Sequence, residues 1–102
     1  LQMGKEKLID VLQMDTGGLG FTGWRKVMPK IVEMEAQASP HTWGDPLKVC
    51  YTAHLAAGLG NIPTIEGIPS KTHDADLSGY RLEDGVLHIS EDAPGFGMKL
   101  II

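Results

Sequence analysis

The stretch VLQMDTGGLG (11–20) decides how this chain folds, because a nearly continuous apolar run ends at a carboxylate and a glycine-rich turn. An apolar run of this kind is typical of a strand buried on both faces, as in a parallel sheet. Two further strand-like segments, ASPH (38–41) and IPTIE (62–66), follow after helix-like intervals. The order strand, helix, strand, helix, strand predicts an α/β fold with parallel strands.

Two helices are expected between these strands. The first, roughly Trp24 to Gln37, follows a predicted turn at TGGLGFTG (16–23), and Pro29 inside it is expected to produce a kink. The second begins at Asp45, a good N-cap residue, with Pro46 at the first helical position.

The C-terminal quarter has a different pattern. Short strand-like runs at 80–83 and 86–89 flank Asp84-Gly85, which is a strong signal for a two-residue hairpin turn. Alternation along this hairpin predicts one buried face, and a last apolar strand is expected over 98–102. The residues on the predicted buried face are Tyr80, Leu82, Leu87 and Ile89.

Three parallel strands with two helices cannot cover both faces of a sheet and protect its edges. A segment of a closed (β/α) barrel has this pattern, so the chain is expected to be a fragment of a larger fold. It also begins with Leu1 rather than Met, and we expect further sequence upstream. We divide the chain into 1–79, a C-terminal portion of a barrel domain, and 80–102, a C-terminal hairpin and strand segment.

Composition narrows the possible functions. A chain of 102 residues makes one domain at most, and a net charge of −4 argues against a nucleic-acid surface. The single cysteine, Cys50, excludes an internal disulfide framework and fits a reducing, cytoplasmic location. No apolar run approaches membrane-spanning length, so no membrane partner is expected.

Three side chains close the strand-like segments: Asp15, His41 and Glu66. Parallel strands point their C-terminal ends the same way, so these groups are predicted to converge as an acid–base centre. A carboxylate beside an imidazole fixes its tautomer and raises the basicity of the other ring nitrogen. The alternative is a capping Asp15, a loop His41 and a solvated Glu66. Trp43 either forms the wall of a pocket or simply packs.

Two other patterns carry weaker signals. Cys50 and His54 lie four residues apart on a predicted helix, as metal ligands do, but no second pair accompanies them. A buried cysteine and a core histidine with satisfied hydrogen bonds are the better reading. The TGGLG turn lacks both the GxGxxG and the P-loop patterns, so phosphate binding is not expected.

Four stretches together resemble one known family: LQMDTGGLGFTGW, SPHTWGDPLKVCYTAHLAAGL, IPTIEG and DGVLHISEDAPGFGMKL. They are similar to the C-terminal part of the enolase superfamily, in its mandelate racemase/muconate lactonizing enzyme-like group, which includes sugar-acid dehydratases. The resemblance implies a (β/α)7β TIM-type barrel with a separate α+β capping domain. This chain would supply about the last three β/α units and a hairpin that returns to the capping domain.

The resemblance also implies roles for the strand-end residues. Asp15 and His41 match the catalytic dyad of the family at the ends of its sixth and seventh strands, and Glu66 matches the acidic group beside the substrate carboxylate. Trp43 is expected to contact substrate. The implied enzyme is a Mg²⁺-dependent lyase that removes the proton alpha to a carboxylate, forms a metal-stabilised enediolate and eliminates water.

The same resemblance places the metal ligands upstream, so no metal ligand is expected in this chain, and the fragment alone is expected to be inactive. The stretch between His41 and Ala53 is longer than in mandelate racemase, which favours a dehydratase of a polyhydroxylated sugar acid. A racemase or epimerase of a 2-hydroxy acid and a non-catalytic binding module remain alternatives. The expected partner is a small sugar acid, and the full-length protein is expected to form a homo-oligomer.

Overall fold

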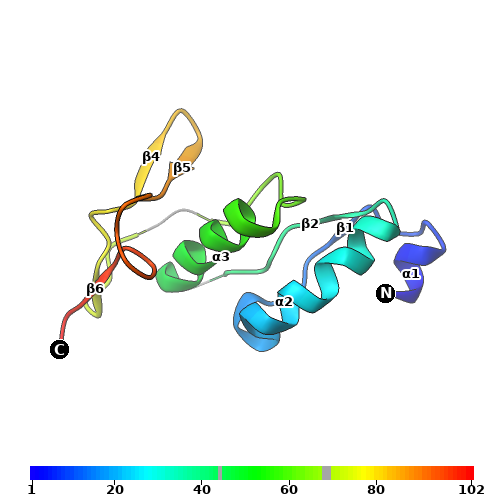
Figure 1. The fold of residues 1–102 in the computed structure, drawn as a ribbon, viewed down its shortest axis with the longest axis horizontal. Helices are drawn as coiled ribbons and strands as arrows, with labels where there is room; N and C mark the ends of the chain where they lie inside the picture. Colours follow the sequence, from blue (N-terminus) through cyan, green and yellow to red (C-terminus); the bar gives the residue numbers. More distant parts are fainter. Residues whose placement is uncertain (44, 68–69) are drawn as a thin grey trace.

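Two helices and a pair of parallel strands form the centre of an elongated molecule, 45 × 28 × 24 Å in extent. The structure is a computed structural model and describes residues 1–43, 45–67 and 70–102. The short helix α1 (Gln2–Lys5) lies at one end and strand β6 (Lys99–Leu100) at the other (Figure 1). Gly44, Ile68 and Pro69, all within the predicted barrel portion 1–79, lie outside the described residues.

The first two predicted strands are confirmed as a parallel pair, although each is shorter than expected. Strand β1 (Val11–Leu12) pairs in register with β2 (Gln37–Ala38). The parallel pairing continues beyond the strands, where the His41 N–H donates to the Met14 carbonyl at 3.0 Å. An isolated bridge then joins Asp15 to His41. The backbone therefore brings the ends of the two segments together.

The third predicted strand, 62–66, is wrong: the structure describes all five residues and assigns them no strand. One hydrogen bond ties the start of this segment to β2, from the Ala38 N–H to the Asn61 carbonyl at 3.0 Å. A strand is defined by a ladder of repeated bonds to a neighbour. A single bond does not make a ladder, so the segment is extended without being a strand.

Helix α2 (Thr16–Glu33) begins earlier than predicted, because the glycine-rich residues after Asp15 already form a helical turn. Asp15 is the N-cap and accepts a hydrogen bond from the backbone N–H of Gly18, which offsets the low helix propensity of glycine. The backbone leaves helical geometry at Gly20, with φ of 66° and ψ of 168°. The break therefore falls at Gly20, inside the predicted turn 16–23, and the kink at Pro29 stays a prediction.

Helix α3 (Pro46–Leu59) begins where the sequence predicts. The Asp45 side chain caps it by accepting hydrogen bonds from the Leu47 and Lys48 N–H groups. Cys50 is fully buried on this helix, as expected, and burial raises the pKa of its thiol to about 11. At neutral pH this thiol is protonated and unreactive.

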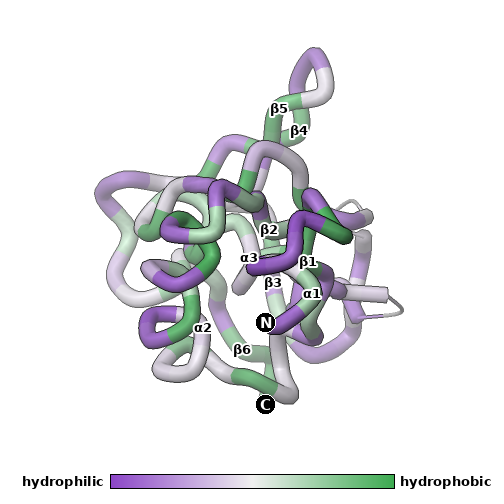
Figure 2. Tube along the Cα trace, turned by 90° about the vertical axis from the view of Figure 1, so that its right-hand side faces the viewer, coloured by the Kyte–Doolittle hydropathy of each residue, from purple (hydrophilic) through white to green (hydrophobic). Residues whose placement is uncertain are grey.

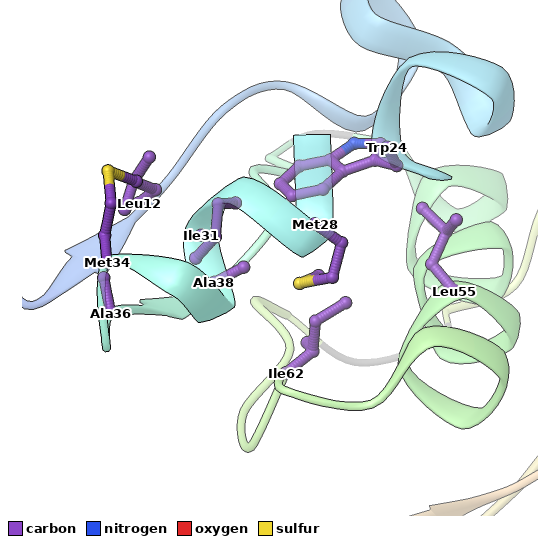
Figure 3. Close-up of a cluster of buried hydrophobic side chains, with 9 residues drawn as sticks. All are labelled: Leu12, Trp24, Met28, Ile31, Met34, Ala36, Ala38, Leu55 and Ile62. Atoms are coloured by element: carbon purple, nitrogen blue, oxygen red, sulfur yellow. The ribbon is translucent and has the colours of Figure 1, made fainter. Parts of the chain in front are cut away.

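The hydrophobic core lies between α2, α3 and the parallel strands (Figure 3). Trp24 and Ile31 of α2 are completely buried, and Leu55 of α3 is 2% exposed. The figure shows Met28 between Trp24 and Ile62, which joins the extended segment after α3 to the helices. The full cluster comprises Leu12, Trp24, Met28, Ile31, Met34, Ala36, Ala38, Leu55 and Ile62.

The predicted hairpin is confirmed. Strands β4 (Arg81–Glu83) and β5 (Val86–His88) pair antiparallel about Asp84 and Gly85, whose φ angles of 50° and 78° are those of a type I′ turn. Its predicted buried face is wrong, because Leu82 is 46% exposed and the other three residues of that face, Tyr80, Leu87 and Ile89, are only partly buried. The hairpin projects from the body (Figures 1 and 2).

The last strand is also present, as β6, and it pairs antiparallel with β3 (Ala75–Asp76). Strand β3 lies in a polar stretch where no strand was predicted. The division of the chain at residue 79 stays a prediction. Across the ranges that the structure describes, no helix is long and apolar enough to cross a bilayer.

Candidate functional site

Asp15 and His41 are placed beside each other by main-chain contacts. The Thr16 N–H donates to the His41 carbonyl at 3.1 Å, and the His41 N–H donates to the Met14 carbonyl. Asp15 is further fixed as the N-cap of α2, where its Oδ1 accepts from the Gly18 N–H at 2.6 Å. The second oxygen, Oδ2, does not take part in this cap and contacts the side chains of His41 and Lys48.

The Oδ2 atom of Asp15 lies 3.3 Å from His41 Nδ1, as the predicted dyad requires. The backbone N–H of Gly18, then Lys48 and His41, hold the pKa of Asp15 well below its ordinary value of 3.8. Because an ionised carboxylate only accepts hydrogen bonds, this contact places a proton on Nδ1. The other ring nitrogen, Nε2, is then free to accept or return a proton.

Glu66 reaches the same place from the extended segment after α3. Its Oε2 accepts hydrogen bonds from the backbone N–H groups of Thr42, at 2.7 Å, and Trp43, at 3.2 Å. The Thr42 hydroxyl donates to the Glu66 carbonyl at 2.6 Å, so Thr42 holds both the side chain and the backbone of Glu66. These bonds do the positioning that the absent strand ladder was expected to do.

The imidazole of His41 lies between the two carboxylates. Its Nδ1 faces Asp15, and its Nε2 lies 3.8 Å from Glu66 Oε2. The three side chains are 43%, 38% and 28% exposed for His41, Asp15 and Glu66, so the group is reachable from solvent. A partly open imidazole with a fixed tautomer and a carboxylate on each side can take up and release a proton beside a bound ligand.

Lys48 joins this group and was missed in the sequence. Its Nζ donates to Asp15 Oδ2 at 2.9 Å, and its side chain is 26% exposed. A signal was available: Lys48 lies in the first turn of α3, where the helix dipole disfavours a positive charge. A cation in that position points to a compensating anion nearby, and Asp15 supplies it.

Trp43 was expected either to form the wall of a pocket or simply to pack, and its exposure argues against simple packing. Its side chain is 77% exposed, while its backbone N–H binds Glu66. A role in contacting substrate stays a prediction. His54 is partly buried and is satisfied by hydrogen-bond contacts with the Tyr80 hydroxyl at 3.0 Å and the Phe96 carbonyl at 3.2 Å, which supports the reading as a core histidine.

Comparison with protein families identifies the family of this chain. The model of the enolase C-terminal domain-like family matches residues 1–101. The chain belongs to that family. The α/β pattern and the parallel pair are therefore those of an enolase C-terminal domain-like fold, consistent with part of a TIM barrel.

Three solved structures similar to this enolase C-terminal domain-like chain come from Geobacillus. A mutant galacturonate dehydratase from Geobacillus sp., complexed with Mg, is 30% identical with a TM-score of 0.90 and covers 98% of this chain. A mandelate racemase/muconate lactonizing protein from Geobacillus sp. Y412MC10, complexed with magnesium and tartrate, is 30% identical with a TM-score of 0.89, again over 98% of the chain.

A galacturonate dehydratase from Geobacillus sp., complexed with D-galacturonate and 5-keto-4-deoxy-D-galacturonate, is 30% identical over 97% of the chain, with a TM-score of 0.88. The matched region is 26% of the length of each of these three proteins, so the present chain spans about a quarter of them. No match was found among curated proteins.

The magnesium in two of these similar structures raises the question of a metal site here. In the described residues, no group of three or more His, Cys, Asp or Glu side chains is arranged to hold a metal ion. Asp15 is already bound by Lys48 and by the Gly18 N–H. The described residues of this family member therefore do not fit a Mg²⁺ site, and a ligand set outside the chain stays a prediction.

The double contact between Thr42 and Glu66 leads to a stability prediction. Thr42 is 1% exposed, so replacing it with valine leaves the Glu66 carbonyl without its hydroxyl donor in a buried place. We expect Thr42→Val to lower the free energy of unfolding by about 1–2 kcal/mol, measured by urea denaturation of the full-length protein. Thr64→Val, at an exposed position, is the matched control and should change the free energy of unfolding by less than about 0.5 kcal/mol. Equal stability of the two variants would contradict the prediction.

Proposed function

We propose that the chain is the C-terminal part of a Mg²⁺-dependent dehydratase of acid sugars. In this proposal it supplies about the last three β/α units of a (β/α)7β barrel, and its hairpin returns to a capping domain. The observation that carries the proposal is the imidazole of His41 between Asp15 and Glu66. Family membership and the likeness to two galacturonate dehydratase structures support the choice of reaction.

The proposed reaction removes water from a polyhydroxylated acid. A base takes the proton from the carbon beside the carboxylate, and the electron pair of that C–H bond forms an enediolate. The neighbouring carbon then loses its hydroxyl group, which leaves as water after receiving a proton. The resulting enol rearranges to a keto-deoxy acid, so the overall change is the loss of one molecule of water.

His41 is the proton carrier in this proposal. Its Nε2 faces away from Asp15, so this atom takes the proton from carbon, delivers one to the departing hydroxyl, or does both. Asp15 orients the ring and stabilises the imidazolium that forms. Glu66, held by the N–H groups of Thr42 and Trp43, lies beside Nε2, and in this proposal its carboxyl O–H donates a hydrogen bond to an enediolate oxygen on which negative charge develops.

The metal enters the proposal through residues outside this chain, because the described residues do not fit Mg²⁺. A divalent cation held by such residues would neutralise the carboxylate of the substrate and so make the neighbouring C–H bond more acidic. The residues described here supply the proton transfers and the orientation of the carrier.

The proposal is tested by supplying the full-length protein with Mg²⁺ and a panel of aldonic and uronic acids, D-galacturonate among them. The expected result is a keto-deoxy acid, detected with a carbonyl reagent, together with the loss of one water in the product mass. Removing the cation with a chelator should abolish the product, and restoring Mg²⁺ should recover it.

Two other outcomes point to the alternatives. Exchange of the α proton with solvent deuterium without loss of water supports a racemase or epimerase. If the protein binds sugar acids but neither exchanges nor dehydrates any of them, a non-catalytic binding module is supported instead. Either outcome contradicts the dehydratase.

A further inference from the structure

One oxygen of Asp15 is shared between a permanent cation and the imidazole. Lys48 Nζ lies 2.9 Å from Asp15 Oδ2, and His41 Nδ1 lies 3.3 Å from the same atom. The Lys48 side chain is 26% exposed, so water screens this contact only in part. The three groups come from different parts of the chain: the cap of α2, the segment after β2 and the first turn of α3.

Local features make room for Lys48 at this place. A Cβ atom added at Gly17 would lie 3.2 Å from Lys48 Cε and 3.4 Å from Asp15 Oδ1, so the glycine leaves space for the lysine chain. The Asp45 cap fixes the backbone at the other end by accepting from the Lys48 N–H. The position also opposes the dipole of α3, so the contact is formed at some cost to that helix.

We propose that Lys48 is a positioning residue of the dyad: its ammonium group holds Asp15 Oδ2 in place and weakens proton binding at His41. The charged groups that face the imidazole are Asp15, Glu66 and, through the shared oxygen, Lys48. The two carboxylates favour the imidazolium, and the lysine opposes it. Asp45, the other charged group at the start of α3, is bound by backbone N–H groups of its own helix.

The consequence for catalysis rests on the proposed dehydratase. An imidazole between two carboxylates, with no cation nearby, binds its proton tightly and gives it up slowly to a departing hydroxyl group. A nearby cation lowers the proton affinity of the imidazole and so makes the imidazolium a stronger acid. Lys48 would thereby allow one histidine to serve both proton transfers near neutral pH.

The test follows the imidazole itself and needs no substrate. In the full-length protein with ¹⁵N-labelled histidine, the titration midpoint of His41 is read from its ring nitrogen shifts. We expect Lys48→Met to raise that midpoint by about 0.5 to 1 pH unit, because removal of the cation leaves both carboxylates unopposed. Lys48→Arg keeps the charge and should restore the midpoint to within about 0.2 units of the original.

Lys7→Met is the matched control, because Lys7 is also paired with a carboxylate, that of Glu35. Lys7 Nζ also binds the Met34 carbonyl at the C-terminal end of α2, whereas Asp15 caps the N-terminal end, roughly 25 Å away by helix rise. Its loss should leave the His41 midpoint unchanged. An unchanged or lowered midpoint in Lys48→Met overturns the proposal.

A second measurement covers the case in which Lys48→Met does not fold. In the unaltered protein, the Lys48 ammonium should give a ¹⁵N signal with a coupling across the hydrogen bond to the Asp15 carboxyl carbon. Absence of that coupling also overturns the proposal. Neither measurement depends on turnover, so a failed substrate screen and a failed Lys48 assignment are told apart.

Discussion

Replacing His41 with asparagine is expected to lower turnover of the full-length protein by at least about 10³-fold. The imidazole is the group whose Nε2 faces Glu66 while its Nδ1 is held by Asp15, so it carries the proton in the proposed reaction. Asparagine has a similar reach and can still hydrogen-bond to Asp15, but it does not titrate. The substitution therefore removes proton transfer while it preserves packing at a site that is 43% exposed.

The measurement is the single-turnover and steady-state rate of sugar-acid dehydration, with Mg²⁺ binding followed separately by calorimetry. We expect cation binding to be retained, because the ligands are placed outside this chain. His88→Asn, on the exposed hairpin strand β5, is the matched control and should keep full activity. Turnover by His41→Asn at the original rate would remove His41 from the mechanism.

The second large effect is expected for Asp15→Asn, which should lower kcat by about 10²- to 10⁴-fold. The amide oxygen can still accept from the Gly18 N–H, so the N-cap of α2 survives the change. What is lost is the negative charge that orients the imidazole, stabilises the imidazolium and binds Lys48. With that charge gone, Lys48 faces the imidazole without an anion between them.

The pH range of this effect follows from the direction of the Asp15 pKa. Since hydrogen bonds from Gly18 and Lys48 hold it well below 3.8, Asp15 is ionised throughout the neutral and mildly acidic range. The defect of Asp15→Asn should therefore be present across that range rather than appear near one pH. Asp10→Asn, an exposed carboxylate just before β1, is the control with the same chemical change. Similar rates for the two variants would contradict the role of Asp15.

Local signals predicted the elements that are formed by short-range contacts. The cap and proline at Asp45 and Pro46 located the start of α3, and Asp84-Gly85 located the hairpin turn. The segment 62–66 was predicted as a strand from its apolar content, but a strand needs a ladder of bonds to a neighbour, which no local pattern guarantees. The start of α2 was missed because glycine disfavours a helix and a capping side chain reversed that preference.

The site was predicted as a convergence of strand ends, and the bridge between Asp15 and His41 produces that proximity. Glu66 arrives by another route, since backbone N–H groups of Thr42 and Trp43 hold it where no ladder does. Such contacts depend on main-chain direction and cannot be read from residue type. Lys48 was overlooked although its place in the first turn of α3 was a signal, because the anion that it binds lies 33 positions away in the sequence.

The contacts that place Asp15, His41 and Glu66 are mostly made by main-chain atoms: the bridge to His41, the Gly18 N–H, and the N–H groups of Thr42 and Trp43. Main-chain donors are the same whichever side chain is attached to them. The surrounding sequence can therefore drift widely without moving the reactive groups, which fits a TM-score of 0.90 at 30% identity. In such a scaffold the side chains around the site can change while the main-chain contacts that hold Asp15, His41 and Glu66 are kept.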